Sequence, residues 1–140
     1  MKLTKLADYA VRAVVHLGGK KPGELATTEE IAGANMIPRA FLAKVMQALC
    51  KGGLVVGHRG KSGGFALARA GKEITVRQIV EAVEGPIQLN RCLVMTALCE
   101  RDAYCGAHGV WREAQDAILK VLDSHTVADM AKKQEENLKR

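Results

Sequence analysis

Three cysteines in the second half of the chain, with a histidine close behind them, are the side chains with the most evident chemistry. Six residues separate Cys92 from Cys99, five separate Cys99 from Cys105, and His108 lies three positions further on. These spacings are too long for the Cys-x-x-Cys knuckles of common structural zinc sites. Three thiolates suit an iron–sulfur cluster, which normally takes four protein ligands, so a fourth must come from elsewhere or the fourth position remains open. His108 and Asp8 are the candidates.

The composition predicts one compact domain with an uneven charge. The chain has 140 residues and a formal net charge of +6. Residues 1–72 carry 12 Lys and Arg against 4 Asp and Glu, whereas residues 73–140 carry 9 against 11. A cationic half beside a slightly anionic half is typical of a DNA-binding region joined to a separate partner or sensor region, although ordinary solvated surface gives the same count.

The chain shows neither a signal peptide nor an apolar run of the roughly 20 residues that a membrane helix needs. We therefore expect a cytoplasmic protein with no membrane partner. In that compartment the four cysteines are reduced at rest, which favours metal ligation or redox chemistry over structural disulfides. Cys50 lies among apolar neighbours and is expected to be a small buried hydrophobe rather than a ligand.

The elements that must position these cysteines begin with three helices. Thr4 is the expected N-cap of a helix over residues 5–17. Thr27 and Glu30 predict a capping box that opens a short helix. A longer helix begins near Pro38, in its first turn, and ends at Gly52-Gly53, with Phe41 on its apolar stripe.

A capped short helix, a tight turn and a longer helix form the helix-turn-helix order. The second helix of that motif enters the major groove, so its exposed face is the expected base-reading face. Arginine and lysine reach guanine edges or phosphates, glutamine pairs with adenine or a phosphate, and alanines allow close approach to thymine methyls. The residues on that face are Arg39, Ala40, Ala43, Lys44 and Gln47. The alternative is a solvated face on an ordinary helical hairpin.

Two short apolar strands, residues 54–56 and 65–67, flank a glycine-rich basic stretch over 57–64 and predict a β-hairpin wing. Arg59 at its tip suits a narrow minor groove, and Lys61 and Ser62 accompany it as expected DNA contacts. A nucleotide-binding loop fits poorly, because Gly60-Lys61-Ser62 lacks the earlier glycine of a P-loop and no helix follows it.

The expected fold is mainly α with a small β-hairpin. It comprises a winged helix-turn-helix domain over 1–85, a cysteine-bearing loop over 86–108, and a dimerisation helix with a charged tail over 109–140. The apolar seam of that helix consists of Val110, Ala114, Ala117, Ile118, Val121 and Leu122. Two such helices pair about a two-fold axis, or one folds back onto its own domain. The tail, residues 131–140, predicts a frayed helix or a disordered end.

These pieces together resemble the Rrf-type family of winged helix-turn-helix bacterial transcription regulators, in its IscR-like and NsrR-like iron–sulfur branches. The resemblance covers nearly the whole chain. It rests on the opening 1–4 with 8–10, the block 37–49, the run from 53 through 59–60 to 65, the stretches 74–76 and 84–85, and the three cysteines. It implies a homodimeric transcription factor that reads a palindromic operator in double-stranded DNA and often carries an iron–sulfur cluster.

The resemblance also implies two ligand sets. The IscR-like set is Cys92, Cys99, Cys105 and His108 around a two-iron cluster. The NsrR-like set replaces His108 with an acidic residue near the other subunit's N-terminus, here Asp8, around a four-iron cluster. The first spacer is one residue longer than usual, which leaves the cluster type open. We favour Asp8, because an oxygen ligand is easily displaced in a gas or redox sensor. Alternatively, Asp8 stabilises the helix dipole and His108 is a surface residue.

We therefore expect a homodimeric regulator whose operator affinity is controlled by an iron–sulfur cluster that senses redox state, nitric oxide or iron supply. The alternative is a cluster-free regulator that uses Cys92, Cys99 and Cys105 as a thiol-redox or zinc switch. A different class is a metal-binding or electron-transfer protein with the winged helix as a protein-interaction scaffold. An enzyme is not expected, since no nucleophile, base and orienting group occur at recognisable spacing.

Overall fold

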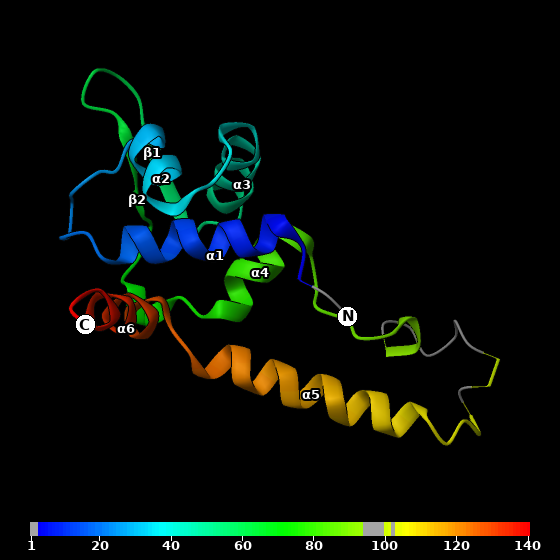
Figure 1. Ribbon diagram of the computed structural model, residues 1–140. Helices are drawn as coiled ribbons and strands as arrows, with labels where there is room; N and C mark the ends of the chain where they lie inside the picture. The colour runs from blue at the N-terminus through cyan, green and yellow to red at the C-terminus, as the bar shows by residue number, and fades with distance from the viewer. Residues whose placement is uncertain (1–2, 94–99, 102) are drawn as a thin grey trace.

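The computed structural model describes residues 3–93, 100, 101 and 103–140. The main elements are six α-helices and one two-stranded antiparallel hairpin, and they confirm the expected fold class (Figure 1). In chain order they are α1 (Lys5–Gly18), α2 (Thr28–Asn35), α3 (Arg39–Lys51), β1 (Val55–His58), β2 (Gly64–Leu67), η1 (Gly71–Glu73), α4 (Val76–Glu84), η2 (Arg91–Leu93), α5 (His108–Ser124) and α6 (Val127–Leu138). None of the described helices is long and apolar enough to span a membrane.

Helix α1 lies at the centre of the molecule, with α2, α3 and the hairpin on one side and α4 and α6 on the other (Figure 1). Thr4 caps it as expected, because its hydroxyl accepts a hydrogen bond from the amide of Ala7 at 3.1 Å. The side chains of Ala10, Ala13 and Val14 have no exposed surface. Such small residues let neighbouring helices approach the α1 backbone closely, and this gives the core its compactness.

Helix α2 has only half of the expected capping box. The Thr27 hydroxyl accepts a hydrogen bond from the amide of Glu30 at 3.1 Å, but the Glu30 carboxylate does not accept one from the Thr27 amide. It lies 2.7 Å from Nε2 of His16 and forms an ion pair with Lys20 instead. A cationic amine is a stronger partner for a carboxylate than a neutral amide is. The hydrogen bonds from Lys20 and then His16 hold the pKa of Glu30 below its usual value.

Helix α3 differs from expectation at two positions. Pro38 is the N-cap, one residue before the helix, rather than a member of its first turn. Phe41, expected on the apolar stripe, lies at the edge of the core with 37% of its surface exposed. Its ring meets that of Tyr9 in an edge-to-face arrangement, with centroids 5.6 Å apart. The remaining stripe residues are buried: Leu42, Val45, Met46 and Leu49.

The wing hairpin is present, with strands slightly offset from the expected ranges. Val55 pairs with Leu67 and His58 with Gly64. The hairpin is tied to the loop before α2, where the amide of Phe65 donates to the carbonyl of Ala26 at 2.8 Å. Gly64 has a φ of 158°, and a Cβ there would lie 2.7 Å from the Ala26 carbonyl oxygen. Only glycine therefore permits this close approach of the wing to the domain.

Helix α4 begins at the expected cap. The Thr75 hydroxyl accepts from the amide of Gln78, whose side-chain carbonyl accepts from the Thr75 amide, so this capping box is complete. Buried Ile79 and Val80 pack α4 into the core. The helix ends at Gly85, with a φ of 81°.

The C-terminal region contains two helices where one helix and a charged tail were expected. The tail is not a frayed or disordered end: it belongs to α6, which is capped by Thr126 and packs on α1. Val127 is fully buried there, and Gly18 makes room for it, since a Cβ on Gly18 would lie 2.5 Å from a Val127 methyl. The sequence analysis predicted a frayed or disordered end because it gave the many charges of this segment more weight than its few apolar residues.

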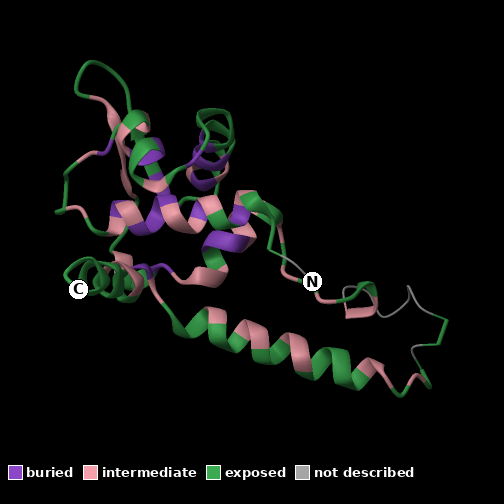
Figure 2. Ribbon diagram, viewed as in Figure 1, coloured by how far each residue is buried: buried purple, intermediate pink, exposed green. Residues whose placement is uncertain are grey.

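Helix α5, by contrast, buries none of its residues (Figure 2). It runs outward from α4, and its apolar residues Val110 and Val121 are 57% and 56% exposed. The seam is divided in the single chain: Ile118 and Leu122 are half-buried and line a hollow of about 220 Å³ with Val80 of α4, whereas Val110 and Val121 are exposed. The alternative of a helix that packs on its own domain is therefore met in part, and the other part of the seam is uncovered in the single chain.

Replacing Val127 with alanine tests the docking of α6. We expect Val127→Ala to lower the free energy of unfolding by about 2 kcal/mol, because it removes buried methyl groups and leaves a cavity against α1. Chemical denaturation followed by circular dichroism measures the change. The control is Val56→Ala, since Val56 is 40% exposed, and it should cost less than about 1 kcal/mol. Equal effects of the two changes would mean that α6 does not contribute to the core.

Candidate nucleic-acid interface and metal-ligand segment

The expected base-reading residues share one exposed face of α3. Leu42, Val45, Met46 and Leu49 hold the opposite face in the core, so the helix cannot rotate without losing its packing. All five predicted residues are exposed: Arg39, Ala40, Ala43, Lys44 and Gln47. The face is open enough for a groove of DNA to approach.

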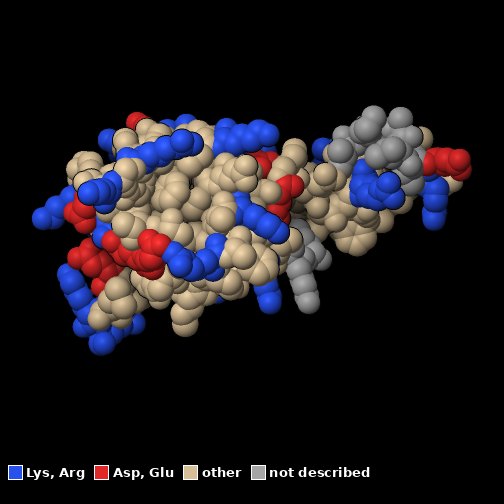
Figure 3. Space-filling view, turned by 90° about the horizontal axis from the view of Figure 1, so that it is seen from above, with Lys and Arg blue, Asp and Glu red and all other residues tan. Residues whose placement is uncertain are grey.

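The predicted wing contacts Arg59, Lys61 and Ser62 are also exposed, at the turn between β1 and β2. The turn is closed by a hydrogen bond of 3.0 Å from the amide of Gly63 to the carbonyl of Gly60. A hollow of about 540 Å³ separates this tip from the start of α2. Figure 3 views the molecule from the side of α2, α3 and the wing, and shows Lys and Arg spread over that side with acidic groups among them.

An acidic side chain of α2 contacts the start of α3 directly. The guanidinium of Arg39, at the start of α3, donates to the carboxylate of Glu29 in the first turn of α2. Sequence analysis placed Arg39 on the reading face but did not find this partner. The signal was weak, because ten residues and a turn separate the two positions.

Asp8, a candidate fourth ligand, is engaged within its own helix. Its carboxylate lies 2.7 Å from the Arg12 guanidinium, one turn further along α1. Arg12 also donates to the backbone carbonyl of Asn35 at 3.1 Å and lies over the ring of Tyr9. Arg12 thus joins Asp8 to the end of α2, immediately before the turn into α3. Asp8 is also an acidic residue in the first turn of α1, where it favours the helix dipole.

The structure describes two of the three cysteines of the predicted ligand set. Cys92 lies in η2 and Cys105 just before α5, and both are half-buried free thiols. His108 begins α5, and its amide donates to the Cys105 carbonyl at 3.3 Å. Cys99 lies outside the described residues. Within the described part of a single chain, no three His, Cys, Asp or Glu side chains gather as a metal site.

Cys50 differs from the other cysteines. It packs against the core at the end of α3, and burial raises the pKa of its thiol. A thiol with a raised pKa is a poor nucleophile and a poor ligand at neutral pH. These surroundings agree with the expected small hydrophobe.

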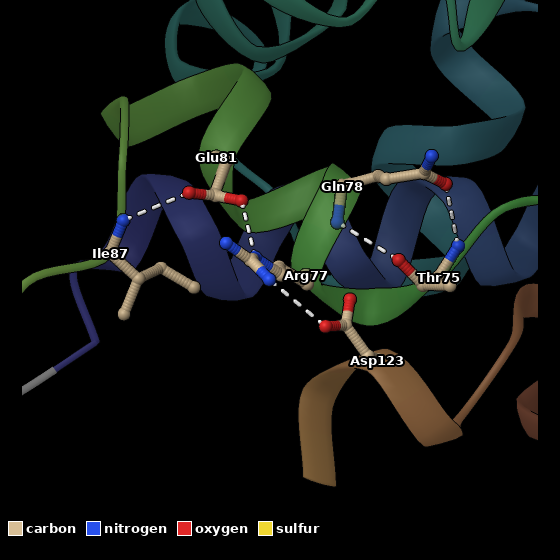
Figure 4. A network of polar contacts seen from close by, with 6 residues as sticks. All are labelled: Thr75, Arg77, Gln78, Glu81, Ile87 and Asp123. Carbon is tan, nitrogen blue, oxygen red and sulfur yellow. Dashed lines mark hydrogen bonds and ion pairs between the residues drawn. The ribbon is translucent and has the colours of Figure 1, made fainter. Parts of the chain in front are cut away.

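A polar network joins the start of the cysteine segment, residues 86–108, to α4 and to α5 (Figure 4). The Glu81 carboxylate in α4 accepts from the amide of Ile87 at 3.1 Å and from Arg77 at 2.7 Å. Arg77 also donates to Asp123, in the last turn of α5, at 3.0 Å. Sequence analysis did not find this network: Asp123 is 46 positions from Arg77, although Arg77 and Glu81 have the i,i+4 spacing of a helical ion pair.

A second contact fixes the same segment further along. The amide of Leu89 donates to the side chain of Gln115 in α5 at 2.8 Å. The segment before Cys92 is therefore attached at one end to α4 and at the other to the middle of α5.

Comparison with protein families agrees with this architecture. A model of the Rrf2 family, described as an iron-dependent transcriptional regulator, matches residues 3–133. The chain belongs to the Rrf2 family of transcriptional regulators. It is 34% identical to the transcriptional regulator NsrR of Bacillus subtilis over 140 residues, covering 99% of this chain and 96% of that protein. It is 36% identical to NsrR of Oceanobacillus iheyensis over 139 residues, covering 99% and 95%.

Solved structures of family members have the same fold. IscR of T. potens superposes with a TM-score of 0.79 at 28% identity, covering 98% of this chain and 90% of that one. CymR, described as the global cysteine regulator of B. subtilis, superposes with a TM-score of 0.79 at 26% identity, covering 95% and 98%. The relatives are named as transcription regulators, a DNA-binding and non-enzymatic role. The sequence resemblance is thereby confirmed.

Replacing Arg59 tests the wing. We expect Arg59→Ala to weaken DNA binding by about 1–3 kcal/mol, since an arginine at the tip suits the minor groove. Fluorescence anisotropy with a duplex selected by the intact protein from a random-sequence pool measures the loss. The matched control is Arg140→Ala in the α6 region, across α1 from the wing. An Arg59 variant that binds as tightly as the control would contradict the wing assignment.

Proposed function

We propose that this Rrf2-family regulator is a homodimer that binds a palindromic operator, with an affinity controlled by an iron–sulfur cluster held at the cysteine segment. The cluster responds to redox state, nitric oxide or iron supply. The DNA contacts are the exposed residues of α3 and the wing: Arg39, Ala40, Ala43, Lys44, Gln47, Arg59, Lys61 and Ser62.

The observation that carries the proposal is the attachment of the cysteine segment to both neighbouring parts. Ile87 is bonded to α4 through Glu81, and Leu89 is bonded to α5 through Gln115. Helix α4 in turn packs on α1 and α3. A change in the segment that moves Ile87 or Leu89 therefore acts on an element that touches the recognition helix and on the helix that pairs the subunits.

The donor chemistry of the segment fits an iron–sulfur cluster. Cys92, Cys99 and Cys105 supply three thiolates, and Asp8 or His108 supplies the fourth ligand. Such a cluster, when bound, supplies redox-active iron whose ligands can be lost or replaced. The resemblance to NsrR-like members implies that in the four-iron form the fourth ligand is Asp8 of the partner subunit.

Asp8 connects the proposed ligand set to the turn before α3. In the single chain its carboxylate is bound to Arg12, which also holds the carbonyl of Asn35 before α3. If Asp8 were to bind iron, Arg12 would lose the anionic partner that holds it beside the Asn35 carbonyl. The Arg12 contact at the α2–α3 turn would then depend on the ligand state of Asp8.

Metal content tests the cluster. Strictly anaerobic purification should give a brown protein with matched iron and acid-labile sulfide, and the amount per dimer separates two-iron from four-iron clusters. Cys105→Ala should remove the iron, and the DNA affinity of that variant should no longer respond to nitric oxide. Cys50→Ala is the matched control and should keep both properties.

The fourth ligand is tested in the same preparation. Asp8→Ala should change the visible spectrum, whereas His108→Ala should leave it unchanged; the reverse result would favour the two-iron site with His108. A colourless protein without iron after reconstitution would overturn the cluster proposal. It would favour the cluster-free alternative, in which Cys92, Cys99 and Cys105 act as a thiol-redox or zinc switch.

The homodimer is supported by the exposed part of the α5 seam. Val110 and Val121 are 57% and 56% exposed, whereas Ile118 and Leu122 are half-buried near Val80 of α4. Such a stripe is unfavourable in water and is typical of a helix that pairs with a copy of itself. A two-fold pair presents two recognition helices to successive turns of DNA, which matches a palindromic operator.

A charge in the α5 stripe tests the dimer. We expect Val121→Glu to convert the protein from two chains to one, because a buried carboxylate at a symmetric interface meets its own copy. Sedimentation equilibrium measures the mass. Leu138→Glu is the control, since Leu138 is an exposed apolar residue on α6. A Val121→Glu protein that stays dimeric would place the interface elsewhere.

A further inference from the structure

Glu29 is a carboxylate on the side of the molecule that carries the basic groups of α3 and the wing. It lies in the first turn of α2 and is 68% exposed. It also lines the hollow of about 540 Å³ between α2 and the wing tip, together with Arg59 and Lys61. An exposed carboxylate at this place repels the phosphates that the surrounding cations attract. A carboxylate at this place therefore weakens nonspecific attraction to DNA.

Its partner is the first residue of the recognition helix. Arg39 is 67% exposed and donates to Glu29. Lys44, Arg59 and Lys61 form no ion pair within the part of the chain that the structure describes. Among these four cations, Arg39 is thus the one that forms an ion pair with a carboxylate of the same chain. The packing of α2 against α3 places the two partners side by side.

We propose that Glu29 is a specificity-determining residue that keeps Arg39 from binding phosphates on unrelated DNA and releases it to a matching base pair. The inference rests on the proposed DNA-binding function and adds a residue to it. Moving Arg39 from Glu29 to a phosphate exchanges one anion for another and leaves the Glu29 carboxylate unpaired near the backbone. On unrelated sequences Arg39 therefore stays with Glu29.

A matching base changes this balance. Guanine offers two acceptors in fixed positions in the major groove, and a good bidentate contact discriminates roughly five- to 150-fold against the wrong base. An exposed ion pair holds its partners by only about fivefold or less. The Glu29–Arg39 pair is thus strong enough to compete with a phosphate and weak enough to yield to guanine.

The test measures affinity and its salt dependence for two duplexes. One is a duplex that the intact protein selects from a random-sequence pool, and the other is a shuffled duplex of the same composition. Glu29→Gln should tighten binding to the shuffled duplex by about two- to fivefold. It should also steepen the salt dependence there by roughly one phosphate contact, because Arg39 becomes free to bind the backbone. The ratio of selected to shuffled affinity falls.

Two further variants separate this role from a general effect of charge. Glu135→Gln removes the carboxylate of an exposed ion pair with Lys139 on α6, and it should leave the ratio unchanged. Glu29→Gln combined with Arg39→Ala should lose the tightening, because the effect acts through Arg39. Circular dichroism confirms that each variant is folded.

The outcomes are distinguishable. Equal effects of Glu29→Gln and Glu135→Gln, or a tightening that persists without Arg39, would overturn the inference while DNA binding itself stands. Arg39→Ala that weakens both duplexes equally would make Arg39 an ordinary phosphate contact and would also overturn it. An intact protein that selects no duplex would overturn the proposed function, and this inference with it.

Discussion

The whole structure depends on how closely five other elements can pack around α1. The side chains that face them are small, Ala10, Ala13 and Val14 among them, and Gly18 leaves just enough room for Val127 of α6. The neighbouring elements therefore approach the α1 backbone closely at these positions, while larger side chains such as Tyr9 and Leu17 complete the packing. The exposed face of α3 is aimed by this packing, since the opposite face must stay in the core. A displacement of α1 consequently moves the reading surface as a unit.

The same helix also carries the polar groups that connect the reading surface with the proposed ligand set. Arg12 binds Asp8 on one side and the Asn35 carbonyl on the other, and Tyr9 packs against Phe41 of α3. A second connection runs along the opposite side of the domain, from Ile87 through Glu81 and Arg77 to Asp123. The cysteine segment begins at the Ile87 end of this second connection. In the proposed function its state acts on α3 through α4, and on α5 through the Leu89–Gln115 contact.

Features set by neighbouring residues were predictable, and features set by distant ones were not. The Thr4 and Thr75 caps, the glycines that end helices and the hairpin follow from local hydrogen bonding and backbone freedom, and the structure has them. In the Thr27 capping box the predicted hydrogen bond from the Thr27 amide to Glu30 is absent, because the fold brings Lys20 and His16 to the Glu30 carboxylate. The Glu29 partner of Arg39 was missed for the same reason. Helix α6 is an exception, because its Thr126–Asp129 capping box is local, and the charges that follow Val127 were given more weight than this signal.

The two ion pairs that the proposals require to exchange partners, Arg39–Glu29 and Arg12–Asp8, are both exposed, and such an exchange requires this. A buried pair is too costly to separate, since each freed charge loses its only compensation in a medium that solvates it poorly. An exposed pair is weak, because water replaces either partner readily. Arg39 and Arg12 are each held by such a pair, with Glu29 and Asp8. Each arginine is therefore held in the free protein and still available for exchange. In our proposals a base edge would replace Glu29 at Arg39, and a metal would draw the Asp8 carboxylate away from Arg12.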